Sequence, residues 1–132
     1  MAIRVVRLGA PRHPGEGTRL GTVRRPPRGV RKEDYGRRDY FDVWLPDVAP
    51  SGELVSWALS EPFTPKRWAR YEKAYRAQMK KPPARRLIAL LAAMSQQTDF
   101  SIGCYCEDET KCHRSILRDL LVEAGAQITN EG

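Results

Sequence analysis

The chain has 132 residues, of which 41% are hydrophobic, and its formal net charge at neutral pH is +7. This length suits one domain over residues 1–132 that buries its own hydrophobic core. No run of ~18 apolar residues is present, which argues against a membrane-spanning helix, and the N-terminus has no apolar signal segment. We therefore expect a cytoplasmic protein with no membrane partner. The sequence carries no indication of an oligomeric state.

The positive charge is concentrated near the N-terminus. Residues 1–38 contain eleven Lys/Arg and three Asp/Glu, a net charge of +8, whereas residues 39–132 carry −1. Within this part, residues 9–38 form a basic, Pro/Gly-rich loop region. Such a surface suits a nucleic acid or a phosphorylated small molecule, although it also suits a solvated face that only aids solubility.

The hydrophobic pattern predicts four strands. Each is a short run that contains β-branched or aromatic residues; the first stops at Gly9 and the third at Pro46. These runs are residues 3–8, 19–23, 40–45 and 100–105. We expect the first of them to be central in the sheet.

Capping residues and periodic apolar side chains predict four helices. Ser51 and Thr64 precede the first two, Pro82-Pro83 separates the second from the third, and Thr110 is the expected N-cap of the last, which Gly125 ends. The inward stripes are Trp68, Tyr71 and Tyr75; Leu87, Leu90, Leu91 and Met94; and Ile116, Leu117, Leu120, Leu121 and Ala124. The order of elements predicts an α/β fold, a three-layer sandwich with a small, mostly parallel sheet flanked by helices.

The basic loop contains candidate anion-binding residues. Two prolines and Gly29 restrict the backbone around Arg28, so this guanidinium can be held in one direction. A disordered basic segment is the alternative. We assign anion binding to Arg24, Arg28 and, from the C-terminal part of the chain, Arg114.

All three cysteines lie at the last predicted strand-to-helix turn. Cys104 and Cys106 end the strand, an acidic loop with Glu107 follows, and Cys112 and His113 begin the helix. Three clustered cysteines, an odd number, argue against a disulfide framework and for free thiols, a metal site or a reactive group. The C-terminal ends of strands are also where α/β sheets bind ligands.

Three interpretations of this cluster compete. In the first, Cys106 or Cys112 is a thiolate nucleophile, with its pKa lowered by the helix N-terminus and by Arg114 or Lys111. In the second, Cys104, Cys106, Cys112 and His113 bind zinc or iron, although the usual two-residue spacing between cysteines is missing. In the third, Cys104 is a small core residue and His113 is a buried histidine that hydrogen-bonds the sheet edge.

Two sets of residues carry a resemblance to a known family. One is Cys106-Glu107 and Cys112-His113-Arg114-Ser115. The other is Arg24, Pro27-Arg28-Gly29-Val30, Lys32, Trp44-Leu45, Ala49-Pro50-Ser51, Leu54, Trp57 and the segment from Trp68 to Tyr75. Both resemble the domain of unknown function 488 family, the second its YeaO-like branch, and together they cover nearly the whole chain.

The resemblance implies an α/β domain and leaves the activity open. This sequence departs from the YeaO-like pattern at Val23, where that pattern has an acid, and at Pro26, where it has a tryptophan. YeaO-like members typically lack these cysteines. A function shared by both branches would therefore rest on the basic Pro-Arg-Gly loop rather than on thiol chemistry.

These observations predict an enzyme-like pocket for an anionic ligand, either phosphate-containing or nucleotide-like. Its predicted catalytic residues are Cys106, Glu107, Cys112, His113 and Arg114. The leading interpretation needs no cofactor. The alternatives are a nucleic-acid-binding module that uses the basic N-terminal region, and a Cys₃His site for zinc or iron.

Overall fold

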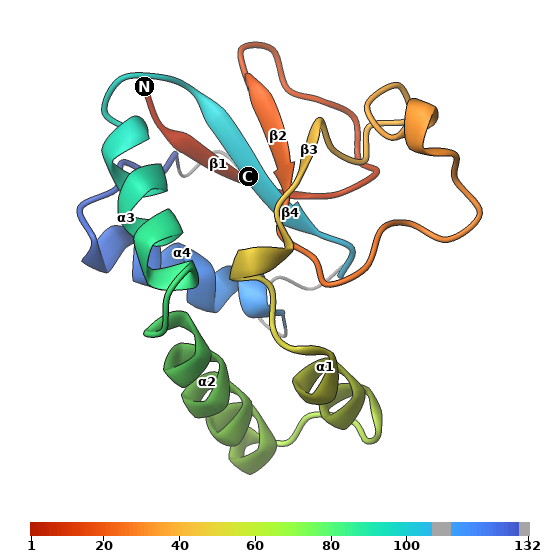
Figure 1. Ribbon diagram of the computed structural model, residues 1–132, viewed down its shortest axis with the longest axis vertical. Coiled ribbons are helices and arrows are strands. Elements are labelled where there is room, and N and C mark those ends of the chain that lie inside the picture. The colour runs from red at the N-terminus through yellow and green to blue at the C-terminus, as the bar shows by residue number, and fades with distance from the viewer. Residues whose placement is uncertain (107–111, 130–132) are drawn as a thin grey trace.

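The computed structural model describes residues 1–106 and 112–129, and a four-stranded parallel sheet lies at its centre (Figure 1). The strands are β1 Ile3–Arg7, β2 Thr18–Gly21, β3 Val43–Trp44 and β4 Phe100–Cys104, in the order β1-β4-β2-β3. Val5, Ile102 and Leu20 form one row across β1, β4 and β2. The expectation of a central first strand was wrong. β1 lies at one edge of the sheet, and β4 pairs with β1 on one side and with β2 on the other.

The helices are α1 Gly52–Leu59, α2 Pro65–Met79, α3 Ala84–Met94 and α4 His113–Glu123, with short 3-10 turns η1 Lys32–Asp34 and η2 Pro46–Val48. Two predicted caps are confirmed, since the hydroxyls of Ser51 and Thr64 accept hydrogen bonds from the third backbone N–H that follows each of them. Thr110 lies outside the described residues. Cys112 directly precedes α4, and its side chain makes no capping hydrogen bond.

All four helices cover one face of the sheet. The connection from β3 to β4 contains α1, α2 and α3, and the connection that follows β4 contains α4. Both run toward the β1 edge of the sheet, so right-handed crossovers place them on the same face. The connections from β1 to β2 and from β2 to β3 move the opposite way and cover the other face with long loops. In Figure 1 the outer part of the second loop, which contains η1, lies away from the helices. The predicted α/β sandwich with a small parallel sheet is confirmed.

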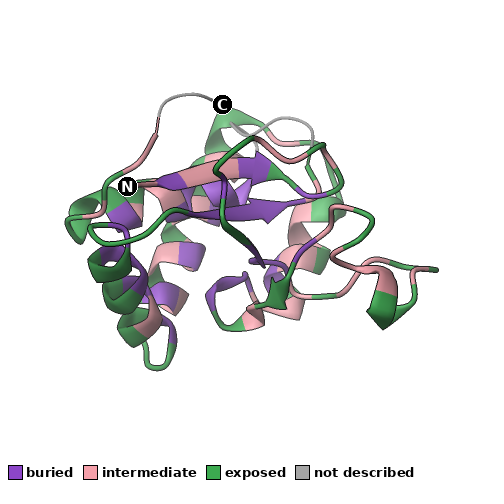
Figure 2. Cartoon of the chain, turned by 90° about the horizontal axis from the view of Figure 1, so that it is seen from above, coloured by how far each residue is buried: buried purple, intermediate pink, exposed green. Residues whose placement is uncertain are grey.

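The main hydrophobic core lies between the sheet and the helices, and Figure 2 shows buried residues on the strands and on the inward helix faces. The predicted inward stripe of α3 needs a correction. Leu90 and Met94 are 52% and 37% exposed. The buried face is instead Ala84, Ile88, Leu91 and Ala92. Spacings of four, seven and eight residues from Ala84 describe one helix face, so the true stripe is rotated from the predicted one.

No helix among the described residues combines the length and the apolar character that a bilayer crossing requires.

Candidate functional site

A cavity of about 440 Å³ opens beyond the C-terminal end of β4. One side is formed by the basic loop that follows β2, and the other by α1, the start of α2 and the segment between them. The end of β4 and the N-terminus of α4 contribute Cys106, Cys112 and His113. The cavity therefore lies at the sheet edge where the chain reverses from strand to helix, the usual ligand position in α/β folds.

The basic side of the cavity is built from Arg24, Arg25 and Arg28. The guanidinium of Arg24 donates to the carbonyl oxygens of Pro50, at 3.0 Å, and Ala49, at 3.3 Å, which ties the loop to the start of α1. Arg25 and Arg28 are exposed, and within the described parts of the chain their guanidinium groups have no hydrogen bond or ion pair. Two cations are therefore available to a ligand.

Tyr105 holds this loop in place. Its hydroxyl donates to the backbone carbonyl of Arg25 at 3.0 Å, and its ring packs edge-on against Tyr40. Burial, and then the charges of two neighbouring tyrosines, raise the pKa of Tyr105 above its ordinary value, so the hydroxyl keeps the proton that it donates. Nothing in the sequence pattern marked this residue as part of the site; it directly follows the last residue of β4.

His113 is buried in the first turn of α4, as the third interpretation of the cysteine cluster expected. Its Nε2 lies 2.5 Å from the carbonyl oxygen of Thr22, and a carbonyl only accepts, so Nε2 carries the proton. The unprotonated Nδ1 then faces the Sγ of Cys112 at 3.7 Å. Burial, together with the charge of Arg114, lowers the pKa of His113 to about 4 against the opposing effect of the Thr22 bond. The imidazole is therefore neutral near pH 7.

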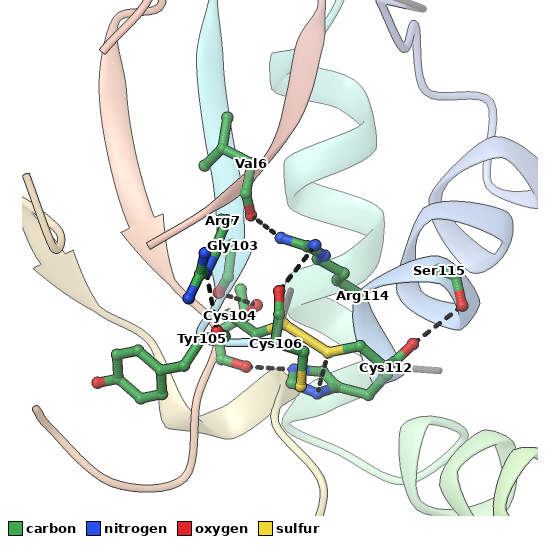
Figure 3. Close-up of a disulfide and its surroundings, with 11 residues drawn as sticks. Val6, Arg7, Gly103, Cys104, Tyr105, Cys106, Cys112, Arg114 and Ser115 are labelled. Atoms are coloured by element: carbon green, nitrogen blue, oxygen red, sulfur yellow. Dashed lines mark hydrogen bonds between the residues drawn. A yellow bond between two sulfur atoms is a disulfide. The ribbon is translucent and has the colours of Figure 1, made fainter. Parts of the chain in front are cut away.

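The three cysteines converge, and two of them are paired. Cys104 and Cys112 form a disulfide across a Cα–Cα distance of 7.8 Å, and Cys106 is exposed and lies outside this disulfide (Figure 3). The expectation of three unpaired cysteines is corrected in this respect. The sequence alone could not reveal the pairing, because the eight-residue separation says nothing about how closely the strand end and the helix start approach. Cys104 is buried, as the core interpretation required.

Arg114 lies behind the cavity rather than in its wall. It is 4% exposed, and its guanidinium donates to the carbonyl oxygens of Val6, at 2.6 Å, and Cys106, at 3.0 Å (Figure 3). It therefore fastens the start of α4 to β1 and to the end of β4. The structure brings Arg24, Arg28, Cys106, Cys112 and His113 to one cavity. Glu107 and Lys111 lie outside the described residues.

The apolar wall was missed as part of a site. Val55 and Leu59 of α1, Phe63, and Tyr71 of α2 line it. The rings of Phe63 and Tyr71 meet at 5.3 Å between centroids. Burial, and then the charge of Cys106, raise the pKa of Tyr71 above its ordinary value. The helical spacing of Tyr71 indicated a core position, and it is indeed buried; only the tertiary fold shows that this core borders a cavity.

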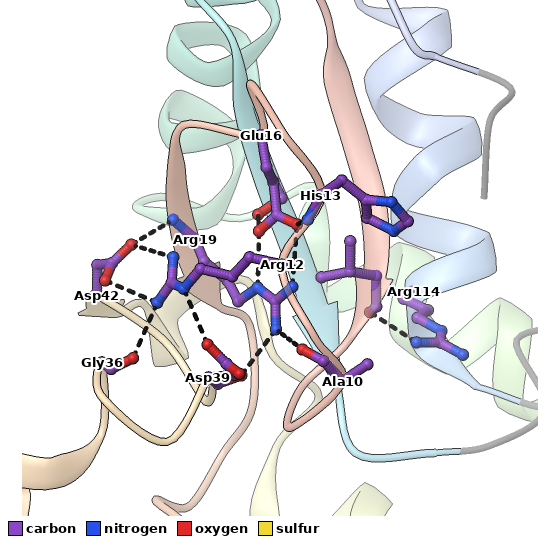
Figure 4. A network of polar contacts seen from close by, with 11 residues as sticks. Ala10, Arg12, His13, Glu16, Arg19, Gly36, Asp39, Asp42 and Arg114 are labelled. Carbon is purple, nitrogen blue, oxygen red and sulfur yellow. Dashed lines mark hydrogen bonds and ion pairs between the residues drawn. The ribbon is translucent and has the colours of Figure 1, made fainter.

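A second polar cluster, also missed, lies on the loop-covered face of the sheet (Figure 4). Arg19 makes two bonds to the Glu16 carboxylate, at 2.7 and 2.9 Å, and both side chains are almost fully buried. Arg19 also donates to the carbonyl oxygens of Ala10 and Asp39, and the Ser101 hydroxyl donates to Glu16 at 2.8 Å. The sequence held one indication of this cluster. Arg19 is the one arginine of the second predicted strand, and alternation along a strand turns its side chain to the face opposite Leu20.

Arg12 extends this cluster toward the surface. It makes two bonds to the Asp42 carboxylate, at 2.8 and 2.9 Å, and Asp42 also accepts from the backbone N–H of Arg19 at 2.8 Å. These contacts join the loop after β1 to the loop after β2. The cluster thus stabilises the loop layer, and its charges are satisfied within the fold.

Comparison with known proteins agrees with the family resemblance. No curated protein and no solved structure matches the chain. A family model does match, over residues 3–125, and its description is the active DUF488-N3 subclade. Because this match covers nearly all of the sequence and includes the cavity, the chain belongs to the DUF488 family.

Proposed function

We propose that this protein binds a phosphorylated ligand with a flat, apolar part, of the nucleotide class, and that Cys106 acts on it. One observation carries the proposal. Arg25 and Arg28, two exposed guanidinium groups without partners in the described parts of the chain, share a cavity with an aromatic wall and with Cys106, an exposed cysteine outside the disulfide. Its volume, about 440 Å³, is in the size range of small-molecule sites.

The two sides of the cavity suit the two parts of such a ligand. A guanidinium binds phosphate through parallel N–H···O bonds, which are stronger than bonds between neutral groups. The rings of Phe63 and Tyr71 and the side chain of Val55 offer an apolar surface to a base. A phosphate at the arginines and a base at the aromatic wall would place the rest of the ligand over Cys106.

The surroundings of Cys106 favour its thiolate. The N-terminus of α4 and the guanidinium groups of Arg25 and Arg28 bring positive charge to the same cavity. A thiolate is the nucleophilic form of cysteine, so the reaction class that this arrangement supports is covalent catalysis by sulfur. Cys112 is paired with Cys104, which leaves Cys106 as the nucleophile.

Ligand binding tests the first part. Nucleoside monophosphates, the matching nucleosides and inorganic phosphate are titrated by calorimetry. We expect a nucleotide to bind and Arg28→Gln to weaken it by about 1.5–3 kcal/mol, roughly 10- to 100-fold, the usual contribution of a charged hydrogen bond. The control is Arg31→Gln, an exposed arginine of the same segment that does not line the cavity. No binding of any nucleotide, or an equal loss in both variants, would reject the assignment.

Alkylation tests the second part. The rate at which iodoacetamide modifies Cys106 is measured between pH 5 and pH 10, and the modified residue is identified by peptide mass spectrometry. A midpoint below the ordinary cysteine pKa of ~8.5 is expected. If Cys106 reacts only above that pH, Cys106 is not an activated nucleophile and this part of the proposal is rejected.

A second candidate function is binding of single-stranded nucleic acid. A neighbouring hollow of about 570 Å³ shares Arg25, Arg28 and Tyr105 with the first cavity and adds Tyr40. Arginines between two hollows match a phosphodiester flanked by two nucleosides, with bases stacking on tyrosine rings. Labelled RNA and DNA of about ten nucleotides should bind with an affinity that falls steeply as salt increases. Absence of any shift at low salt would remove this candidate.

A further inference from the structure

The sulfur atoms of the three cysteines form one compact group. The Sγ atoms of Cys104, Cys106 and Cys112 all lie within 4.8 Å of one another (Figure 3). Cys104 and Cys112 are buried, whereas Cys106 is exposed, and both Cys106 and Cys112 line the cavity. Three soft ligand atoms therefore meet where the interior of the protein opens to the ligand site.

The backbone explains why the sulfurs meet. Cys104 is the last residue of β4, and Cys106 follows it by two residues, just beyond the end of the strand. Cys112 precedes α4 in an extended conformation, with φ −135° and ψ 149°, and its Sγ lies within 4.8 Å of the other two. Arg114 fastens the two segments through its bond to the Cys106 carbonyl. The group is thus held by the sheet and a helix.

The spacing of the two backbones suits a bridging ion. The Cα atoms of Cys104 and Cys112 are 7.8 Å apart. Protein disulfides usually span ~4.4–6.8 Å between Cα atoms. Two thiolates on one tetrahedral zinc ion lie ~3.8 Å apart, as follows from Zn–S bonds of ~2.3 Å, so an ion between them accommodates a wider backbone separation.

The local charge suits thiolates. A divalent ion bound by three thiolates carries one net negative charge. The N-terminus of α4 begins at the residue after Cys112, and the buried guanidinium of Arg114 contacts the Cys106 backbone. Both place positive charge beside the sulfurs, which lowers the free energy of the thiolate form. The Nε2 of His113 is hydrogen-bonded to the Thr22 carbonyl oxygen, and its Nδ1 lies 3.7 Å from the Sγ of Cys112.

We propose that the reduced protein binds one thiophilic divalent metal ion, of the zinc class, through the thiolates of Cys104, Cys106 and Cys112, with the fourth coordination position open to the cavity. Three protein ligands and one open position are the pattern of a catalytic rather than a structural zinc site. Reduction of the Cys104–Cys112 disulfide by a dithiol consumes two electrons and two protons, and the dithiol becomes a cyclic disulfide. The metal ion then displaces the three thiol protons.

The test is a cobalt titration of the full chain. The protein is reduced with a dithiol, freed of it under nitrogen, and titrated with Co²⁺ and then Zn²⁺. We expect one equivalent of Co²⁺ to produce thiolate-to-metal charge-transfer absorption with the intense visible bands of a tetrahedral centre, and one equivalent of Zn²⁺ to abolish them. Bound Zn²⁺ should also protect all three thiols from alkylation.

The informative variant is Cys106→Ser, because this side chain is exposed and its change should not disturb the core. We expect it to lose the charge-transfer bands. Arg28→Gln is the matched control: it alters the same cavity without removing a sulfur and should bind Co²⁺ as the unchanged chain does. That control also separates this inference from nucleotide binding, which Arg28→Gln should weaken.

Two results would overturn the proposal. One is a fully reduced chain, with three titratable thiols, that gives no stoichiometric cobalt spectrum. The other is a Cys106→Ser variant with the same cobalt affinity and spectrum as the unchanged chain.

Discussion

Two groups of arginines in the basic N-terminal part behave in opposite ways. Arg12 and Arg19, on the loop-covered face, are paired with carboxylates and carbonyl oxygens, and Arg19 is fully buried. Arg25 and Arg28, at the cavity, are exposed and have no partner among the residues that the structure describes. All four arginines contribute equally to the net charge of +8 of residues 1–38. Only the unpaired cations can attract a ligand, so the net charge of a segment overstates its binding surface.

The physical difference is desolvation. A buried guanidinium must regain, from fixed partners, the hydrogen bonds that water supplied, and Arg19 does so with Glu16, Ala10 and Asp39. An exposed guanidinium stays hydrated until a ligand arrives. The first kind of arginine therefore contributes to folding, and the second remains available for the ligand binding that we propose.

The largest effect is expected from breaking the buried pair. Arg19→Met leaves the Glu16 carboxylate buried without its partner, so we expect a loss of about 3–5 kcal/mol in the free energy of unfolding. Urea denaturation measures it. The double variant with Glu16→Leu removes both charges and should recover much of the loss. A single variant within about 1 kcal/mol of the unchanged chain would show that the pair does not hold the loop layer.

Glu16 should also dominate stability in strong acid. Burial raises its pKa, but bonds from Arg19, Ser101 and the backbone N–H of His13 outweigh that effect and lower the pKa from 4.5 to about 2. A carboxylate with a depressed pKa stabilises the fold above pH 4.5, and this stability is lost as the pH falls toward 2, in total about 3 kcal/mol. Urea midpoints of Glu16→Gln should therefore depend less on pH across this window, and an unchanged slope would argue against the assignment.

His113 gives the corresponding test at the cavity. Its pKa is lowered from 6.5 to about 4, chiefly by burial, so the folded chain resists a proton that the unfolded chain accepts. Stability is complete above pH 6.5 and falls by about 3 kcal/mol as the pH drops to 4. His113→Gln should flatten urea midpoints between pH 6.5 and 4, with Glu16→Gln as the control whose slope changes only at lower pH.

The smallest effect on stability is expected at the open arginines. Arg28→Gln removes an exposed side chain with no described partner, so the free energy of unfolding should change by less than about 0.5 kcal/mol. The same variant should lose nucleotide affinity. A loss of more than 1 kcal/mol of stability on urea denaturation would place Arg28 with the structural arginines and undo the comparison.

Local patterns were enough for much of the fold. The caps at Ser51 and Thr64 and the end of α4 just before Gly125 depend on residues within a few positions of one another. Patterns that depend on neighbouring elements were less reliable. Leu90 and Met94 are apolar and correctly spaced, yet the packing of α3 turns them outward. The orientation of a helix about its axis is decided by what it packs against.

The sequence by itself determined the parallel α/β architecture, the family, and the strand-to-helix turn that carries every cysteine. These follow from local propensity, the order of elements and motifs that are contiguous in the chain. The tertiary structure decided that Cys104 and Cys112 pair, that Arg114 fastens backbone while Arg28 borders the cavity, and that Arg19 is buried against Glu16. Those outcomes depend on contacts between residues far apart in the chain, and only the packed layers bring such residues together.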